Sequence, residues 1–289
     1  MESQENQYRW PKAEAVYPDR PGRSYALKRL RYRLRAFLHR GLIVQFEQFI
    51  NRHPFLVKLL NEHADYSYPL VYRFLDKRFN SKQRFQAICD NLLFLPEKLT
   101  ALSAPIYKTP LSFGEVMPDF EMTLLMTTHQ PMEGYWVLEL WHKPRNELVY
   151  LLTFAKLGEA LLISVVQGPN FEGSKEMVKQ LTKTCHGLRP AYLMVEMMKA
   201  LTKALGFKTL LDIPQKYQNK SRFIQSSHYV VDYDAIFAES GGQLKDYWEL
   251  PLEIDRNLDD VPSKKRSMYR KRYAMLGDFA KVIEEKLGL

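Results

Sequence analysis

The sequence is poor in cysteine and in long apolar runs. Among its 289 residues only Cys89 and Cys185 are cysteines, too few for the disulfide framework of a small secreted domain. No stretch of about 18 uncharged apolar residues occurs, so the sequence predicts no membrane-spanning helix. Residues 1–10 also lack the apolar core of a secretory signal. Together these absences predict a cytoplasmic protein.

The sequence also lacks the spaced residues that mark several common chemistries. Its seven histidines and two cysteines are scattered without paired ligand spacing, so no metal site is predicted. There is no Walker loop, no nucleophile elbow and no dinucleotide fingerprint. Internal repeats and low-complexity tracts are absent as well. Nucleotide hydrolysis, serine-hydrolase chemistry and dinucleotide redox chemistry therefore have no sequence signature here.

Positive charge is the clearest excess. The net charge is +9, and much of it lies in two short segments. The first holds Lys28, Arg29, Arg31, Arg33, Arg35 and Arg40, and the second holds Lys264, Lys265, Arg266, Arg270, Lys271 and Arg272. A basic protein can neutralise nucleic acid, anionic lipid or an acidic partner, and charge alone does not choose among these partners.

The N-terminal part reads as helical. Residues 1–23 contain several prolines and predict a flexible lead-in. Residues 24–110 predict a helical region, with breaks expected at Pro54, Pro69 and Pro96. Its first helix, over residues 24–40, is basic and amphipathic and is expected to stop at Gly41; its apolar stripe comprises Leu27, Leu30, Leu34, Phe37 and Leu38. Two interpretations stay open: the stripe packs on the domain, or the helix lies on an anionic membrane surface.

The C-terminal part, residues 111–289, predicts a mixed sheet with a crossover helix. Strand-like runs predict an antiparallel meander over Phe120–Thr127, Tyr135–His142, Glu147–Ala155 and Leu161–Val166, and the last run is rich in β-branched residues. A helix over 190–205 follows, opened by Pro190 and closed by Gly206. It leads to a strand over Lys208–Ile213, which we expect to lie parallel to the strand ending at Val166.

The predicted fold class is therefore α+β, with a helical N-terminal part followed by a mixed sheet. This element order resembles the acyl-CoA N-acyltransferase fold, a likeness at the level of fold alone. On that likeness residues 111–289 form an acyltransferase-like domain with a basic C-terminal helix. The expected cofactor is CoA or another phosphate-bearing acyl donor, without a metal. The alternative is an α+β domain whose glycines and prolines only shape turns.

Two groups of residues are candidates for an anion site. Backbone N–H groups at a helix start attract anions, and guanidinium groups bind phosphate with two bonds. The first group is Gln167, Gly168, Lys179, Lys183, Gly187 and Arg189. The second, Lys264, Lys265, Arg266 and Arg270, crowds a helix start, where cations are unfavourable without a partner. We expect both groups to converge on one phosphate; the alternative is an ordinary solvated basic face.

Candidates for acid–base catalysis are His186, Asp234 and Glu239. Histidine titrates near neutral pH, and a buried carboxyl group can reach the pKa of a general base. The alternative is that His186 packs or caps a turn and that the carboxylates shape loops.

Several short sequence motifs of this chain occur together in one known family. They are Gln167-Gly-Pro169, Leu181-Thr-Lys183, His186-Gly-Leu-Arg-Pro190, Asp232-Tyr-Asp234 with Glu239-Ser-Gly-Gly242, and Leu250-Pro251 followed by the basic run 263–273. In order and spacing, over roughly residues 20–285, the chain resembles the VirK/YbjX family of Gram-negative bacteria.

The resemblance implies a cytoplasmic, envelope- and virulence-associated accessory factor, connected with lipopolysaccharide and antimicrobial peptide resistance. It brings no settled biochemical activity. Two classes of function stay open: an acyl- or aminoacyltransferase using a phosphate-bearing donor, or a non-enzymatic factor that binds anionic lipid, nucleic acid or a protein client. The expected partner is an anionic small molecule or a lipid head group, with peripheral contact to the inner membrane.

Overall fold

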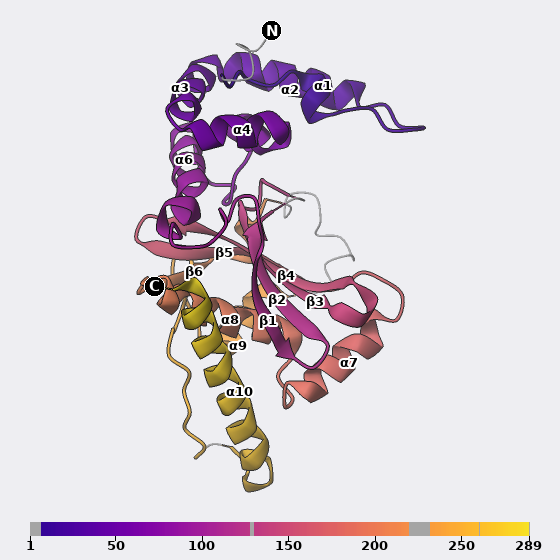
Figure 1. Ribbon diagram of the computed structural model, residues 1–289, viewed down its shortest axis with the longest axis vertical. Helices are drawn as coiled ribbons and strands as arrows, with labels where there is room; N and C mark the ends of the chain where they lie inside the picture. The colour runs from indigo at the N-terminus through magenta and orange to yellow at the C-terminus, as the bar shows by residue number, and fades with distance from the viewer. Residues whose placement is uncertain (1–6, 128–129, 220–231, 260, 289) are drawn as a thin grey trace.

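The computed structural model describes residues 7–127, 130–219, 232–259 and 261–288. Figure 1 shows the N-terminal helices gathered at one end of the molecule and the sheet in the middle, while the long C-terminal helix begins at the opposite end and ends beside the sheet. One cluster of buried apolar residues extends from the N-terminal helices through the sheet to the C-terminal helix. The predicted α+β class, a helical part followed by a mixed sheet, is confirmed.

The N-terminal part consists of short helices that pack on one another. They are α1 (Ala13–Val16), α2 (Ala26–Leu38), α3 (Arg40–Asn51), α4 (Pro54–Glu62), the 3-10 helix η2 (Ala64–Ser67), α5 (Tyr68–Val71) and α6 (Ser81–Lys98). Helix α6 begins with a capping box. The Asn80 side chain accepts from the backbone N–H of Gln83, and the Gln83 side-chain oxygen accepts from the backbone N–H of Asn80.

Two of the predicted helix boundaries are wrong. Gly41 lies inside α3, and the break between α2 and α3 falls at His39. Pro96 lies in the last turns of α6 and does not interrupt it. Tertiary packing carries both helices past these residues, because the buried faces of α3 and α6 outweigh the local cost of glycine or proline. Pro54 and Pro69, in contrast, lie at helix starts, where proline is tolerated.

Residues 8–17 of the expected flexible lead-in pack on the N-terminal helices, whereas residues 18–23 are exposed. Tyr8 is buried, its hydroxyl shares a hydrogen bond of 2.7 Å with Ser67, and its backbone N–H donates to Asn51 Oδ1 at 2.8 Å. Trp10 stacks on Tyr32 with ring centroids 6.0 Å apart. Large aromatic side chains thus bury enough area to hold the first part of this segment in place, and flexibility of the exposed residues 18–23 stays a prediction.

The sheet has the strand order β1-β2-β3-β4-β5-β6-β8-β7. Its strands are β1 (Leu111–Met117), β2 (Phe120–Met126), β3 (Trp136–His142), β4 (Glu147–Leu157), β5 (Ala160–Gln167), β6 (Leu210–Asp212), β7 (Gln243–Leu244) and β8 (Trp248–Leu250). The predicted meander is confirmed as β2 to β5. Strands β1, β7 and β8 were not predicted.

Strands β5 and β6 are parallel neighbours, as expected from the sequence. Helices α7 (Ser174–Thr184) and α8 (Pro190–Ala204) form the connection between them. Helix α8 ends at Gly206, whose φ of +75° suits glycine and whose N–H donates to the Lys203 carbonyl at 2.8 Å. Helix α9 (Tyr233–Glu239) follows, and α10 (Ser263–Leu287) packs along α8.

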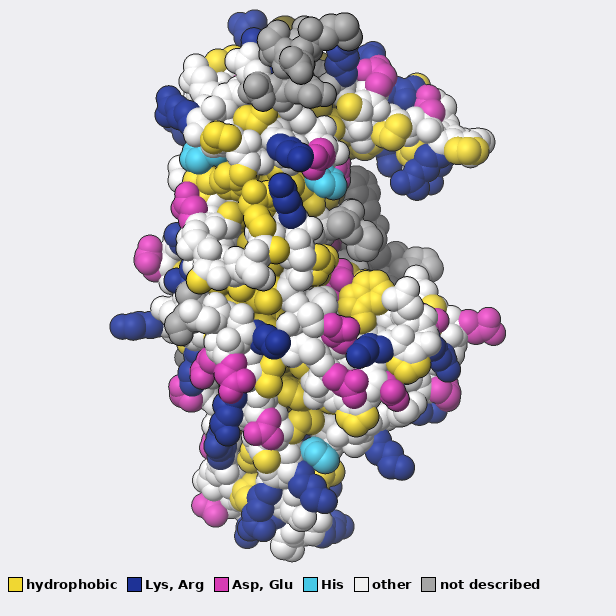
Figure 2. All heavy atoms as spheres, viewed as in Figure 1, with side chains coloured by type: hydrophobic (Ala, Val, Ile, Leu, Met, Phe, Trp, Pro, Cys, Tyr) yellow, Lys and Arg dark blue, Asp and Glu magenta, His cyan; other side chains and the backbone are white. Residues whose placement is uncertain are grey.

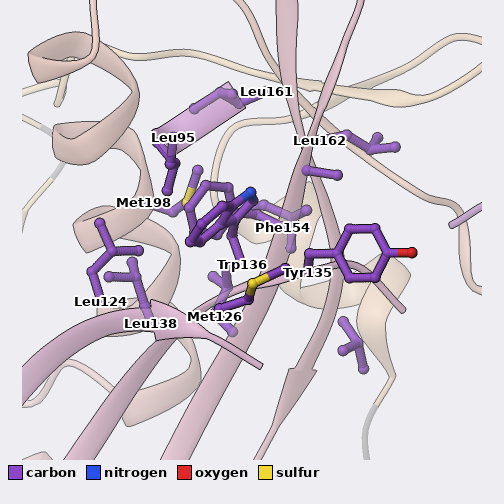
Figure 3. Packing of buried hydrophobic residues seen from close by; sticks show 14 of the residues in the cluster. Leu95, Leu124, Met126, Tyr135, Trp136, Leu138, Phe154, Leu161, Leu162 and Met198 are labelled. Atoms are coloured by element: carbon purple, nitrogen blue, oxygen red, sulfur yellow. The ribbon is translucent and has the colours of Figure 1, made fainter. Parts of the chain in front are cut away.

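Helix α6 joins the N-terminal helices to the sheet through Asn91. Its side-chain oxygen accepts from the Lys156 N–H at 2.7 Å, and its amide nitrogen donates to the Lys156 carbonyl at 2.8 Å. Trp136, fully buried, donates its indole N–H to the Asn91 carbonyl at 2.9 Å. Figure 3 shows the Trp136 ring in the core, with Leu95 of α6 and Met198 of α8 nearby.

Replacement of Asn91 by leucine tests this junction. Asn91→Leu keeps the volume of the side chain but leaves the Lys156 N–H and carbonyl without partners. Each buried unsatisfied group costs about 1–3 kcal/mol, so we expect the free energy of unfolding to fall by about 2–5 kcal/mol. Urea denaturation measures it. Gln86→Ala on the same helix is the control and should change little, because the exposed Gln86 side chain bonds only to the Asp90 side chain among the described residues; equal effects would contradict the role of Asn91.

Candidate functional site

Helix α2 presents its apolar stripe to solvent. Its apolar side chains are 59–68% exposed: Leu27, Leu30, Leu34, Phe37 and Leu38. The residue that α2 buries is Tyr32, on the other side of the helix. The interpretation that the stripe packs on the domain is therefore wrong. The tertiary contacts of Tyr32 with Trp10 and Tyr68 turn the opposite face of α2 to the molecule, and a contiguous exposed apolar face of this kind marks an interaction site.

Cations lie along both edges of the stripe, since successive helical residues are about 100° apart. On one edge Arg29 pairs with Asp19 at 2.8 Å and Arg33 pairs with Glu14. On the other edge are Lys28, Arg31 and Arg35, which make no ion pair within the described ranges. Figure 2 shows hydrophobic and basic side chains side by side on the projecting arm that α1 and α2 form.

A second unusual region is the junction of β5 and β6. The two strands pair only from Leu161 to Ile163, after which β5 continues and the chain leaves β6 at Asp212. Asp212 is fully buried, and neither of its carboxylate oxygens has a hydrogen-bond partner in the described structure. Burial, and then the nearby Asp234 carboxylate, raise the pKa of Asp212 well above its usual value. An orphaned buried carboxylate is costly and points to function.

The predicted residue Asp234 belongs to this junction. Its Oδ1 accepts from the backbone N–H of Gln215 at 3.1 Å and from the indole N–H of Trp248 at 2.8 Å. Asp212 was not among the residues predicted from the sequence. The available signal was a single carboxylate between the apolar residues Leu211 and Ile213 of a predicted strand.

Arg189 and Glu239, predicted for different roles, meet at Tyr192. The Tyr192 hydroxyl donates to Glu239 Oε2. Burial and Glu239 raise the pKa of Tyr192 to about 12, and the Arg189 guanidinium beside it opposes this shift. Arg189 is the N-cap residue of α8, and its side chain makes no capping bond. This leaves a cation, a phenol and a carboxylate together at a helix start.

His186 and Gly187 form the turn between α7 and α8, and α10 holds it. His186 has φ of +52° and Gly187 has φ of +78°. Arg272 of α10 donates to the His186 carbonyl at 2.9 Å, and a Cβ on Gly187 would lie 3.3 Å from Arg272 Nη2. The described contacts of this turn are thus structural, while the predicted catalytic role of His186 stays a prediction.

The other predicted anion-site residues make separate contacts in the described structure. Gln167 donates to Glu133 at 3.2 Å, Gly168 lies against Tyr150, and Lys179 pairs with Glu176 at 3.1 Å. Lys183 lies in the last turn of α7. Lys264, Lys265 and Arg270 are exposed on α10.

Arg266 also lies on α10, and its guanidinium turns back to the carbonyls of Val261 at 3.0 Å and Asp259 at 3.3 Å. Among the described residues, no hydrogen bond or ion pair joins Arg189 to Lys264 or Arg266. The α10 residue that reaches the α7–α8 turn is Arg272. Convergence on one phosphate therefore stays a prediction.

Comparison with known proteins gives the family. The model of the DUF535 family, described as a protein of unknown function, matches residues 21–285. The chain belongs to the DUF535 family. An uncharacterized protein of Haemophilus influenzae is 79% identical over 282 residues, covering 98% of this chain and 97% of the relative. "Membrane protein LapB" of Mannheimia haemolytica is 64% identical over 216 residues, covering 75% of this chain and 96% of the relative.

The uncharacterized protein YbjX of Escherichia coli is 24% identical over 278 residues, covering 89% of this chain and 83% of the relative. The resemblance to the VirK/YbjX family is thus confirmed. No solved structure matches the chain, so the likeness to the acyl-CoA N-acyltransferase fold is not confirmed. Among the helices of the described residues, none is both long and apolar enough to cross a membrane.

Replacement of Asp212 tests whether its carboxyl group is held at a cost. Because the folded-state pKa of Asp212 lies above its unfolded value, folding favours the protonated form. The resulting stability is complete below the unfolded pKa of about 3.9 and is lost as the pH rises through the folded pKa. We expect Asp212→Asn to exceed the wild-type free energy of unfolding at pH 8 by about 1–3 kcal/mol, and to match it near pH 4.

Urea unfolding at the two pH values measures this difference. Asp278→Asn is the control, because Asp278 is an exposed carboxylate of α10; it should show no such pH-dependent gain. A loss of stability in Asp212→Asn at pH 8 would show that the carboxylate has a stabilising partner.

Proposed function

We propose that this DUF535 protein is an envelope-associated accessory factor that docks on the anionic inner-membrane surface through α2. The observation that carries the proposal is the exposed apolar stripe of α2 with cations along both edges. Helices with this pattern lie in the membrane interface, with the apolar face among the acyl chains and the cations at the phosphates.

The energetics favour a membrane over a nucleic acid or water. Full burial of a leucine or phenylalanine side chain contributes about 1.5–3 kcal/mol, and each cation near an anionic surface adds about 1 kcal/mol. A nucleic acid would use the cations but leave the stripe exposed. The name of the Mannheimia haemolytica relative, "Membrane protein LapB", supports the proposal of docking on a membrane. The resemblance to the VirK/YbjX family implies an association with virulence, and we include this association in the same proposal.

A second candidate function is acyl or aminoacyl transfer at the β5–β6 junction, favoured by Asp212 and Asp234. A phosphate-bearing donor such as CoA would supply an activated acyl group, with Arg189 and the start of α8 facing its phosphates. Asp234 takes the proton of an acceptor amine as the new carbon–nitrogen bond forms, beside the Asp212 carboxyl group, whose raised pKa favours its protonated form. The donor's carbon–sulfur bond breaks, and the proton passes on to the leaving thiolate.

Vesicle sedimentation tests the docking proposal. We expect wild-type protein to sediment with phosphatidylglycerol vesicles but weakly with neutral phosphatidylcholine vesicles. Recovery should fall with added salt, since charges are screened within about 8 Å at physiological ionic strength. Leu30→Gln with Leu34→Gln should lower the affinity at least tenfold, because it removes apolar burial.

The matched control is Leu244→Gln, which removes an exposed leucine, 53% exposed, on β7 rather than α2. It should sediment like wild type. Salt-independent recovery that is equal on both vesicle types would rule out electrostatic docking.

Calorimetric titration with CoA tests the second candidate. We expect Arg189→Gln to weaken CoA binding about tenfold, because a charge-assisted bond to phosphate contributes about 1.4 kcal/mol or more. Lys179→Gln is the control: Lys179 is exposed and pairs with Glu176. If wild-type protein binds no CoA, the proposed donor is wrong and docking on the membrane stands alone.

A further inference from the structure

A cavity of about 380 Å³ opens beside the edge of α2 that carries Lys28, Arg31 and Arg35. Its walls come from three parts of the chain: α1 and α2, the η2–α5 segment, and residues 130–132 of the β2–β3 loop. This volume falls within the range of small-molecule sites, about 300–1,000 Å³. It is therefore large enough for a phosphate together with the group that carries it.

The lining combines cations with aromatic rings. Tyr17, Tyr68 and Tyr72 form an aromatic wall, in which Tyr17 meets Tyr68 edge to face at 5.6 Å and Tyr68 stacks on Tyr72 at 5.4 Å. The Arg35 guanidinium lies 4.0 Å from the centre of the Tyr72 ring, and its Nη1 donates to the Tyr68 hydroxyl at 3.4 Å. Arg35 is thus held in place by the wall before any ligand arrives.

The charge of the cavity is unbalanced. Lys28, Arg31 and Arg35 face one acidic lining residue, Asp65. None of these cations makes an ion pair within the described residues, whereas Arg29 and Arg33 on the opposite edge are paired with Asp19 and Glu14. The two edges of one helix therefore differ. One is neutralised within the protein, and the other keeps an excess of about two positive charges for a ligand.

We propose that this cavity binds the phosphomonoester head group of an anionic membrane lipid. The inference rests on the proposed docking of α2. A phosphomonoester carries close to two negative charges near neutral pH, as a phosphorylated side chain does, and so matches the excess of the cavity. A phosphodiester carries only one. Burial raises the pKa of Tyr17 and of Tyr68, so their hydroxyls stay protonated and can donate to phosphate oxygens.

The place of the cavity favours a lipid over a free phosphate. Successive residues of a helix are about 100° apart around its axis. Arg31 therefore lies next to the edge of the stripe that Leu27, Leu34 and Leu38 form. When the stripe enters the membrane, Arg31 lies at the level of the phosphates and the cavity behind it faces the head groups. The apolar stripe then holds the acyl chains of the same membrane.

The test compares two vesicle types of equal surface charge, one containing phosphatidic acid, a monoester, and the other phosphatidylglycerol, a diester. We expect wild-type protein to bind the phosphatidic acid vesicles about tenfold more tightly. Lys28→Gln with Arg31→Gln should abolish this preference. Arg33→Gln with Arg40→Gln removes the same charge outside the cavity, from the opposite edge of α2 and the start of α3, and should weaken binding to both vesicle types while keeping the preference.

Equal binding of wild-type protein to both vesicle types would overturn this inference and leave the docking proposal intact. Failure to bind either vesicle type would overturn the docking proposal itself. If both double variants reduced the preference equally, general charge and not the cavity would be responsible.

Soluble probes distinguish the source of the phosphate. Glycerol 3-phosphate or inorganic phosphate is expected to compete only at millimolar concentration. Micromolar binding of either in the absence of vesicles would identify a soluble phosphate ligand, and tighter binding of AMP would identify a nucleotide. Either result would overturn the lipid assignment.

Discussion

The arrangement of the two parts of the molecule depends on the hydrogen bonds that the side-chain amide of Asn91 makes to the backbone of Lys156. Strand β3 begins at Trp136, opposite Phe154, so Lys156 of β4 extends past the end of its neighbour. Asn91 supplies both bonds that a strand would have made to Lys156. A side chain on α6 thus completes the hydrogen bonding of the sheet edge. The helices that pack on α6 are thereby fixed in position relative to the sheet. Because each lost bond would leave a buried backbone group unpaired, the junction has no low-energy alternative nearby.

The exposed face of α2 is a consequence of this arrangement and of the aromatic residues at its inner side. Tyr32, Trp10 and Tyr68 fill the space between α2 and its neighbours. The leucines of α2 have no room there and remain in water. An apolar face kept exposed in this way weakens neither the core nor the sheet, and it is available for a surface that can bury it. The cavity beside Arg35 uses the same aromatic residues, so docking and head-group binding would share one rigid wall.

The β5–β6 junction shows a second local conflict between stability and use. Pairing of the two strands stops at Ile163, and Asp212 lies in the core with no hydrogen bond to any residue that the structure describes. Local rules of folding tend to be broken where function requires it. The nearby Asp234, in contrast, is anchored by Gln215 and Trp248. A fixed carboxylate beside an unpaired one is a sound basis for proton transfer, whereas His186 is part of a turn that α10 braces.

By itself the sequence determined the local elements. Periodicity predicted α2, the meander from β2 to β5 and helix α8 with its ends at Pro190 and Gly206, because these signals lie within one element. Even the parallel pairing of β5 and β6 followed, since chain direction limits crossover connections. The sequence could not determine which side of α2 faces water, because an apolar stripe looks the same whether it packs on protein or on lipid. Nor could it show that Asn91 would bond to Lys156 or that Asp212 would find no partner among the described residues. Those outcomes depend on residues distant in the chain, and only the tertiary structure decides which of them meet.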